Sequence, residues 1–305
     1  MIRCSSQKPI SRRRRAISGE AQSCLIRQAA PTRILLSGLG FTIAGGSQGE
    51  IKVGIVQTTT NGWTQGDLYF GSGQPGKIGK ISADGTTVVN ANWATLTNST
   101  QMVGETNVFV GGLYIDQTGV FGGDLIVVSG GTGSDAGDTG GAVWRVTASG
   151  NATKLAQVSN PANGADTLLE GVTTVPNDPF KYGPFAGKIL TCAEKLSLLC
   201  TVDTNGTVAT FALVMGDPED ADLVIANQNL FGINFDRFTH SNSTVFKAPK
   251  ALLTSFVDDI VIAEEVANEL VMVHWDGARF LTRRLVVSGA VSLEHVTFAP
   301  IEAQP

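Results

Sequence analysis

The sequence has few of the residues and motifs that build metal-thiolate, nucleotide and membrane sites. Its 305 residues include 4 cysteines and 3 histidines, and their spacing does not fit a zinc site. It has no nucleophile-elbow pattern and no phosphate-binding glycine loop, because its glycine-rich loops lie between predicted strands and not before helices. The apolar run at residues 34–44 is too short to span a bilayer. We therefore expect no zinc centre, no nucleotide loop and no transmembrane segment.

Charged residues are also scarce, at 16% of the sequence, and they are unevenly divided. Residues 1–50 carry eight basic and two acidic residues, a net charge of +6. Residues 51–305 carry 14 basic and 25 acidic residues, a net charge of −11. Because an acidic body repels phosphate backbones, we expect no nucleic-acid partner for this part of the chain.

We interpret residues 1–50 as an irregular or targeting segment that precedes the repeat region. A basic run at residues 12–15 is separated from the apolar run by about twenty mixed residues, whereas a secretory signal joins the two directly. Three interpretations stay open: an unusual or disordered export leader, a misassigned start of the gene, and an arm that binds nucleic acid or membrane. With export as the first of these, we expect an extracellular or periplasmic protein.

Glycine and β-forming residues are abundant. The 36 glycines, together with many Thr, Ser, Asn and Val residues, are typical of an all-β chain with many turns. Hydrophobic residues make up 42% of the sequence and recur periodically, which is enough to build a core and excludes a disordered chain. We therefore treat residues 51–305 as one all-β domain.

A repeat of about 60 residues runs through this domain. Each repeat has a short apolar run, a turn, and a second apolar run. The lead positions are 58, 59, 61 and 63 residues apart, at Gly54, Gly112, Gly171, Gly232 and His295. Each interval holds about four strands, which indicates a β-propeller of four-stranded antiparallel blades around a channel. We predict four full repeats beginning near residues 53, 111, 170 and 231, and five or six blades if terminal strands close the ring.

Three local predictions follow from this repeat. Residues 294–298 should pair with N-terminal residues to close the ring, because open sheet edges promote aggregation. Residues 216–222 (Gly-Asp-Pro-Glu-Asp-Ala-Asp) are interpreted as an exposed loop between blades, which could also bind a cation. Cys192 and Cys200 lie on two predicted neighbouring strands, where they form either a cross-strand disulfide or two buried thiols.

Oxygen-bearing side chains gather where the first strands should line the channel. Glu170 and Glu294 open such strands, Asn234 lies inside one, and Asp116 and Asp236 end theirs. Loops on the same face would add Glu194, Glu264 and Glu265. Carboxylate and amide oxygens suit a hard cation such as Ca²⁺, so the first five residues are the predicted metal ligands. The alternatives are strand-end hydrogen bonding for the glutamates and turn formation for the aspartates.

The blade pattern, with Leu169-Glu170-Gly171 opening an inner strand, resembles the six-bladed propellers of the gluconolactonase-like, senescence-marker-like and NHL group. The resemblance covers roughly residues 50–305. In gluconolactonase-like members, Glu, Asn and Asp side chains of inner strands hold a divalent cation, usually calcium, that polarises a lactone or ester. The resemblance implies such a role for Glu170 and Asn234. The Pro-Asp-Gly turns common in that group are missing, and residues 176–179 (Pro-Asn-Asp-Pro) stand in a comparable place.

Two functions are compatible with these observations. The first is a propeller, expected to be a monomer, that binds a small molecule, glycan or protein on its loop face. The second is a calcium-dependent hydrolase of the lactonase or esterase type. Convergence of at least three oxygen ligands at one point near the channel axis would distinguish them, because the hydrolase requires it and simple binding does not.

Overall fold

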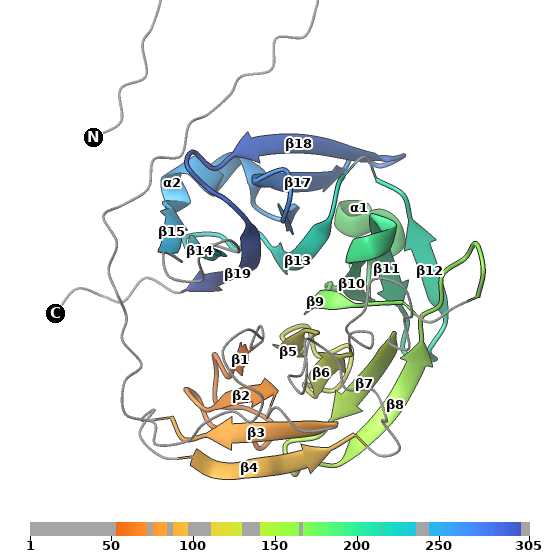
Figure 1. Cartoon of the computed structure of the whole chain (residues 1–305), viewed down its shortest axis with the longest axis vertical. Coiled ribbons are helices and arrows are strands. Elements are labelled where there is room, and N and C mark those ends of the chain that lie inside the picture. The colour runs from red at the N-terminus through yellow and green to blue at the C-terminus, as the bar shows by residue number, and fades with distance from the viewer. Residues whose placement is uncertain are drawn as a thin grey trace, which may run out of the picture.

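The computed structural model describes residues 53–71, 76–83, 88–96, 111–129, 141–164, 167–213, 215–235 and 244–299. The described residues form 19 strands and five short helical segments, and the strands group into five antiparallel sheets. The sheets are arranged around a common centre, which makes the molecule a β-propeller (Figure 1). The predicted all-β propeller is confirmed. It has five blades, and not the six of the group it resembles.

The first three blades each use four consecutive strands. Blade 1 contains β1 (Val53–Ile55), β2 (Leu68–Gly71), β3 (Lys77–Ile81) and β4 (Val88–Thr95). Blade 2 contains β5 (Leu113–Ile115), β6 (Leu125–Val128), β7 (Ala142–Val146) and β8 (Ala152–Gln157). Blade 3 contains β9 (Glu170–Thr174), β10 (Ile189–Ala193), β11 (Leu198–Val202) and β12 (Val208–Phe211). These blades begin where the sequence predicted.

The last two blades are interleaved along the chain. Blade 4 contains β13 (Pro218–Leu223), β16 (Ile260–Glu264), β17 (Glu269–Trp275) and β18 (Phe280–Val286). Between β13 and β16 the chain leaves to form β14 (Asn229–Asn234) and β15 (Thr244–Ala248), which belong to blade 5 with β19 (Leu293–Ala299). It returns through α2 (Lys250–Leu253) and η3 (Thr254–Phe256).

Two sequence predictions are therefore wrong. A fourth blade does not begin near residue 231, because β14 lies in the middle of the blade 5 sheet, between β15 and β19. Residues 216–222 are not an exposed loop, because Pro218–Asp222 are buried within β13, the first strand of blade 4. The many acidic residues of this segment favoured a loop prediction, although the segment is a strand that lines the channel.

The final strand completes blade 5 by pairing with β14. Phe298 lies opposite Leu230, and Val296 lies opposite Gly232. The described partner of β19 is thus β14, while the predicted pairing with N-terminal residues falls on residues 1–52, outside the described part of the chain. In the described residues, blade 5 has three strands.

Among the described residues, apolar side chains form four core clusters, which join blades 1 to 2, 2 to 3, 3 to 4 and 4 to 5. Trp63 and Leu125 lie between blades 1 and 2, and Phe121 and Ile189 between blades 2 and 3. The cluster between blades 3 and 4 includes Phe185 of η1 (Gly183–Phe185), which follows α1 (Pro179–Tyr182). The cluster between blades 4 and 5 surrounds Phe246, Met272 and Phe298. Burial of these faces is the main force that holds the blades together.

The two described cysteines are buried thiols and form no disulfide. Cys200 lies opposite Thr191 and Cys192 opposite Leu199, so their side chains point to opposite faces of blade 3. They enter different core clusters, Cys200 toward blade 2 and Cys192 toward blade 4. Burial raises the pKa of the Cys200 thiol to about 12, which keeps it protonated and unreactive.

Candidate functional site

The inner strands β1, β5, β9, β13 and β19 lie side by side in that order around the centre of the ring. They line a cavity of about 120 Å³, to which all five strands contribute. The wall is apolar along β1 and β5, with Leu113 and Ile115 among its residues. Charged groups enter from β13 and β19, which contribute Asp220, Asp222 and His295.

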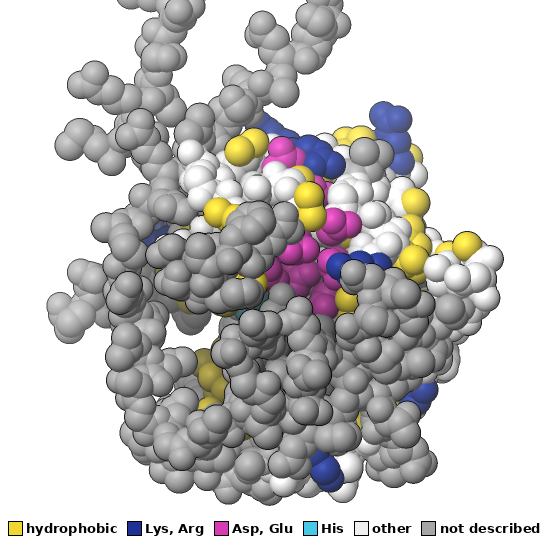
Figure 2. All heavy atoms as spheres, in the orientation of Figure 1, with side chains coloured by type: hydrophobic (Ala, Val, Ile, Leu, Met, Phe, Trp, Pro, Cys, Tyr) yellow, Lys and Arg dark blue, Asp and Glu magenta, His cyan; other side chains and the backbone are white. Residues whose placement is uncertain are grey.

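Three buried glutamates converge at the inner strands of blades 3 and 4. We call Glu170, Glu194 and Glu219 the carboxylate cluster; one carboxylate oxygen from each lies within 4.8 Å of the others. Their residues are 3%, 4% and 3% exposed, respectively. Figure 2 shows acidic side chains gathered at the centre of one face of the molecule, with basic side chains beside them. The cluster therefore brings together three carboxyl groups that water barely reaches.

The backbone at strand ends and at a bulge determines where the side chains of the carboxylate cluster point. Glu170 begins β9, and Glu219 lies in the neighbouring inner strand β13. The register of β13 against β16 shifts between Pro218 and Asp220, so Glu219 occupies a bulge that turns its side chain out of the regular alternation. Glu194 opens η2 (Glu194–Leu196) directly after β10. Strand ends and a bulge thus supply all three carboxylates.

One lysine partly compensates the charge of the cluster. Lys195 Nζ lies 2.8 Å from Glu194 Oε1, and the lysine side chain is 44% exposed. Burial nevertheless raises the pKa of Glu194; Lys195 lowers it in part, and the nearby charges of Glu265 and Asp217 add to the increase. Burial therefore disfavours the charged form of Glu194 even with Lys195 beside it.

A further buried carboxylate has its own cation. Glu264 ends β16 and accepts hydrogen bonds from the Gly216 amide and from Arg284 Nη1, both at 2.8 Å. Arg284 also contacts Glu269 at 2.6 Å. Glu264 is thus held in a structural ion pair at the edge of the acidic centre, and it is not part of the carboxylate cluster.

Glu294 and Asn234 meet at the entry to β19. The Ser292 hydroxyl lies 3.2 Å from Glu294 Oε1 and 2.9 Å from Glu265 Oε1, so it links two carboxylates. The side-chain oxygen of Asn234 accepts hydrogen bonds from the amides of Val291 (2.6 Å) and Ser292 (3.3 Å). Asn234 does not lie in a first strand as predicted; it positions the segment that carries Ser292 and Glu294.

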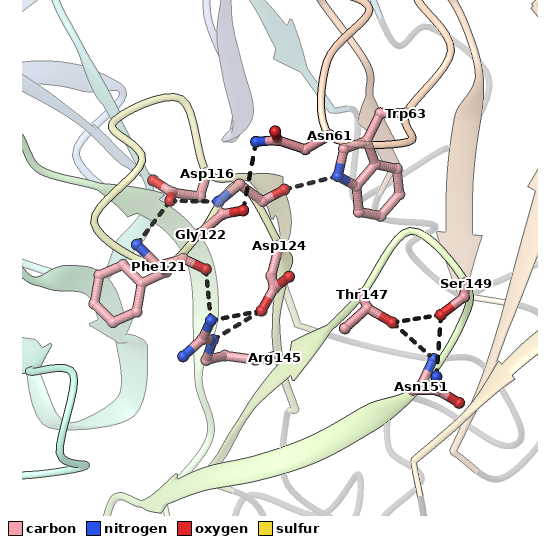
Figure 3. Close-up of polar contacts among 11 residues, drawn as sticks. Asn61, Trp63, Asp116, Phe121, Gly122, Asp124, Arg145, Thr147, Ser149 and Asn151 are labelled. Carbon is pink, nitrogen blue, oxygen red and sulfur yellow. Dashed lines mark hydrogen bonds and ion pairs between the residues drawn. The ribbon is translucent and has the colours of Figure 1, made fainter.

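Of the other two predicted ligands, Asp116 lies in the described part of the chain and Asp236 does not. Asp116 Oδ2 accepts hydrogen bonds from the amides of Phe121 (2.8 Å) and Gly123 (3.1 Å) (Figure 3). Its Oδ1 accepts from the amide and the hydroxyl of Thr118. Although burial opposes the change, these hydrogen bonds lower the pKa of Asp116. Its contacts are those of a turn-forming aspartate. Asp236 lies outside the described residues.

The turn that Asp116 holds is also fixed from both sides. Trp63 Nε1 of blade 1 donates to the Gly123 carbonyl at 2.7 Å, and Arg145 of β7 forms an ion pair with Asp124 at 2.7 Å (Figure 3). Arg145 Nη2 also donates to the Phe121 carbonyl at 2.7 Å. This network links blades 1 and 2 around the turn that Asp116 holds. The role of Asp116 as a metal ligand stays a prediction.

Inside the cavity, His295 is held by a buried aspartate. His295 Nδ1 lies 2.7 Å from Asp220 Oδ2, which also accepts the Val296 amide at 2.9 Å. Asp220 fits here because residue 171 is glycine: a Cβ on Gly171 would lie 2.3 Å from Asp220 Oδ1. Burial, and then the neighbouring Asp220 charge, raise the pKa of Asp222 to about 7. The cavity thus combines an oriented imidazole with a carboxyl group that titrates near neutral pH.

Part of this site is predictable from the sequence. Glu170 and, on the facing loops, Glu194 were predicted to lie there, whereas Glu219 was placed in a supposed loop. A signal was available, since Leu169-Glu170-Gly171-Val172 and Leu293-Glu294-His295-Val296 share the order apolar, Glu, any residue, apolar. Pro218-Glu219-Asp220-Ala221 has the same order with proline first. That comparison would have placed Glu219 at the start of an inner strand.

No protein-family model and no curated protein sequence matches this chain. Solved structures with a similar backbone include a protein of unknown function from Bacteroides caccae, 11% identical, with a TM-score of 0.42. That match covers 78% of this chain and 61% of the other, so the chain spans less than two thirds of that protein's length. They also include a putative gluconolactonase (13% identical, 86% of this chain and 72% of that one, TM-score 0.42). Virginiamycin B lyase from Staphylococcus aureus is a further match, 15% identical, with a TM-score of 0.37. The match covers 84% of this chain and 90% of the lyase.

These likenesses concern the fold alone. Gluconolactonase-like propellers are among the similar structures, as the blade pattern predicted. Within the described residues, the helices are all too short to cross a membrane.

Proposed function

We propose that the protein binds a divalent cation, with Ca²⁺ the best match, at the carboxylate cluster and uses this site to hold a ligand on the central face. The observation that carries the proposal is the convergence of Glu170, Glu194 and Glu219 oxygens within 4.8 Å. Calcium takes oxygen ligands at about 2.3–2.6 Å, so two ligands of one ion lie at most about 5 Å apart. The spacing of the cluster fits that limit.

The donor chemistry supports the same choice. All three cluster residues offer carboxylate oxygens, which suit Ca²⁺, Mg²⁺ and Mn²⁺, whereas zinc sites usually include histidine or cysteine ligands, and the cluster has neither. Without a cation, buried carboxylates at this spacing repel one another and at least one tends to keep its proton. A bound cation would remove that cost, so binding should stabilise the folded propeller.

The ligand itself would enter from the face that carries the cluster. Glu294, from the inner strand of blade 5, and Lys195 are the polar groups we propose as neighbours of the ligand. The expected partners are a small molecule, a glycan or a protein segment with an oxygen donor for the cation. Calcium sites of modest affinity work at the calcium concentrations outside cells, which agrees with the proposed extracellular or periplasmic location.

A calcium-dependent lactonase or esterase is the second candidate, and the His295–Asp220 pair in the cavity favours it. A bound cation would polarise a carbonyl oxygen. His295, fixed by Asp220 at 2.7 Å, could take a proton from water, and Asp222 could return one to a leaving oxygen. The structural neighbours do not decide between the two candidates, because they support the fold alone.

Thermal melting with calcium and with chelator tests the proposal. Calcium at 100 times its dissociation constant should stabilise the parent by about 2.7 kcal/mol, which raises the melting temperature by several degrees. Glu219→Gln should lose most of that increase. Asp276→Asn, which alters a surface turn between β17 and β18, should keep it. The proposal fails if chelator leaves the parent's melting temperature unchanged.

The same protein samples separate the two functions. A hydrolase should release acid from simple lactones or esters in calcium and stop when chelator is added. A binding protein should show the calcium-dependent melting shift without any turnover.

A further inference from the structure

A second pocket lies away from the channel, on blade 4. It has a volume of about 420 Å³ and is formed by η3, β17 and β18 together with Asp259, the residue before β16. Pockets of this volume typically accommodate small organic molecules. The residues that line this pocket are all different from those of the carboxylate cluster and of the channel cavity.

Strand register builds this pocket from two rows of side chains. Met272 of β17 lies opposite Arg283 of β18, and His274 lies opposite Leu281. Because these residues are two apart along each strand, all four project from the same face of the blade. Phe256 of η3 also lines the pocket, so the apolar surface consists of Met272, Phe256 and Leu281.

His274 is oriented by a carboxylate. Its Nδ1 lies 2.7 Å from Asp259 Oδ1, and the two side chains are 56% and 10% exposed. Within the described residues, the other ring nitrogen, Nε2, makes no hydrogen bond. The Asp259 contact therefore fixes the ring and leaves Nε2 at a solvent-accessible edge of the pocket.

Arg283 is the decisive residue. Of the four arginines in the described part of the chain, Arg145, Arg279 and Arg284 each contact a carboxylate. Arg283 has no carboxylate partner there, and its Cζ lies 5.2 Å from the ring centroid of Phe256. An aromatic ring holds the guanidinium in place while its donors stay available. A held, unpaired guanidinium beside an apolar surface is suited to a carboxylate with an apolar tail.

We propose that this pocket binds a small amphipathic carboxylate, such as a medium-chain fatty acid. The carboxylate contacts Arg283, with His274 Nε2 at the same edge, and the hydrocarbon chain lies over Phe256, Met272 and Leu281. The proposal does not depend on the cation site, because the two sites share no residue.

Isothermal titration calorimetry with the full-length protein tests this assignment, with octanoate as the probe. Octanol has the same chain without the charge, and acetate has the charge without the chain. Octanoate should bind at least about tenfold more tightly than either, since a charge-assisted hydrogen bond and the apolar contact both contribute. Arg283→Ala should weaken octanoate binding by roughly tenfold or more.

Two further variants make the experiment specific. Leu281→Ser removes apolar surface and should weaken octanoate while leaving the weak binding of acetate unchanged. Arg279→Ala removes a cation from the same hairpin that is already paired with Asp276, so it should change octanoate binding by less than twofold. The proposal is overturned if octanoate does not bind, if octanol binds equally well, or if Arg279→Ala and Arg283→Ala weaken binding equally.

Discussion

At the scale of single residues, the arrangement of the channel depends on a glycine, because any side chain at residue 171 would clash with Asp220. Gly171 leaves room for the Asp220 carboxylate, which in turn holds His295. Asp220 also places a second negative charge near Asp222, two residues further along β13. Ionisation of Asp222 therefore destabilises the folded protein.

Substitution of Asp222 should change how stability depends on pH. The folded-state pKa of Asp222 is about 7 against an ordinary value of 3.8, so the folded protein binds more protons than the unfolded chain between these values. Stability should therefore fall as pH rises from about 4 to 7, by roughly 4 kcal/mol for this group. Asp222→Asn should remove this decline, with a higher melting temperature than the parent at pH 8.

A matched aspartate gives the opposite sign. Hydrogen bonds from the amides of Arg279 and Ala278 lower the pKa of Asp276, so its contribution to stability is present at neutral pH and lost in acid. Asp276→Asn should therefore lower the melting temperature slightly at pH 8. Parallel pH profiles for the parent and Asp222→Asn would show that Asp222 ionises normally in the folded protein.

At the scale of elements, β19 joins the last two blades. It pairs with β14 and also lies beside β13, the inner strand of blade 4. Its residues Leu293, Val296 and Phe298 enter the core cluster between these blades. The strand thus carries channel residues on a segment that is also central to packing.

Removal of residues 293–305 should abolish cooperative folding. Truncation of a single buried Leu or Phe costs about 2–5 kcal/mol, and a whole domain is stable by only about 5–15 kcal/mol. Loss of the three core side chains of β19 should therefore exceed the available stability. Circular dichroism during heating would show no cooperative transition. Removal of residues 300–305, which takes no described strand residue, is the control, and equal melting curves for both truncations would contradict this role of β19.

The elements also show what the sequence could predict. Blades 1 to 3 were predictable because their strands are short apolar runs separated by glycine and aspartate turns. β13 was not, because Glu219, Asp220 and Asp222 are residue types that single-strand propensity disfavours. The crossing of β14 and β15 into blade 5 was equally hidden, since their apolar pattern does not specify which sheet they join. For the same reason Glu170 was found and its partner Glu219 was missed.

At the scale of the whole molecule, the described ring is unevenly joined. Apolar clusters connect blades 1 to 2, 2 to 3, 3 to 4 and 4 to 5. In the part of the chain that the structure describes, such a cluster is missing between blades 5 and 1. Gln57 Nε2 and the Phe298 carbonyl meet there at 3.5 Å, and the cross-strand pair Ile233 and Val245 is 39% and 47% exposed.

This asymmetry predicts where the propeller opens first. Regions with few buried apolar contacts unfold locally at lower free energy than the global transition. Amide hydrogens of β1, β14 and β15 should therefore exchange faster than those of β10 and β11, whose residues are almost entirely buried. Hydrogen exchange followed by mass spectrometry measures this directly. Calcium should slow exchange in β9 and β13, which hold Glu170 and Glu219, more than in β1. Equal protection of the β14–β15 and β10–β11 amides from exchange would contradict this prediction, because blades 5 and 1 would then be joined as firmly as the other blades.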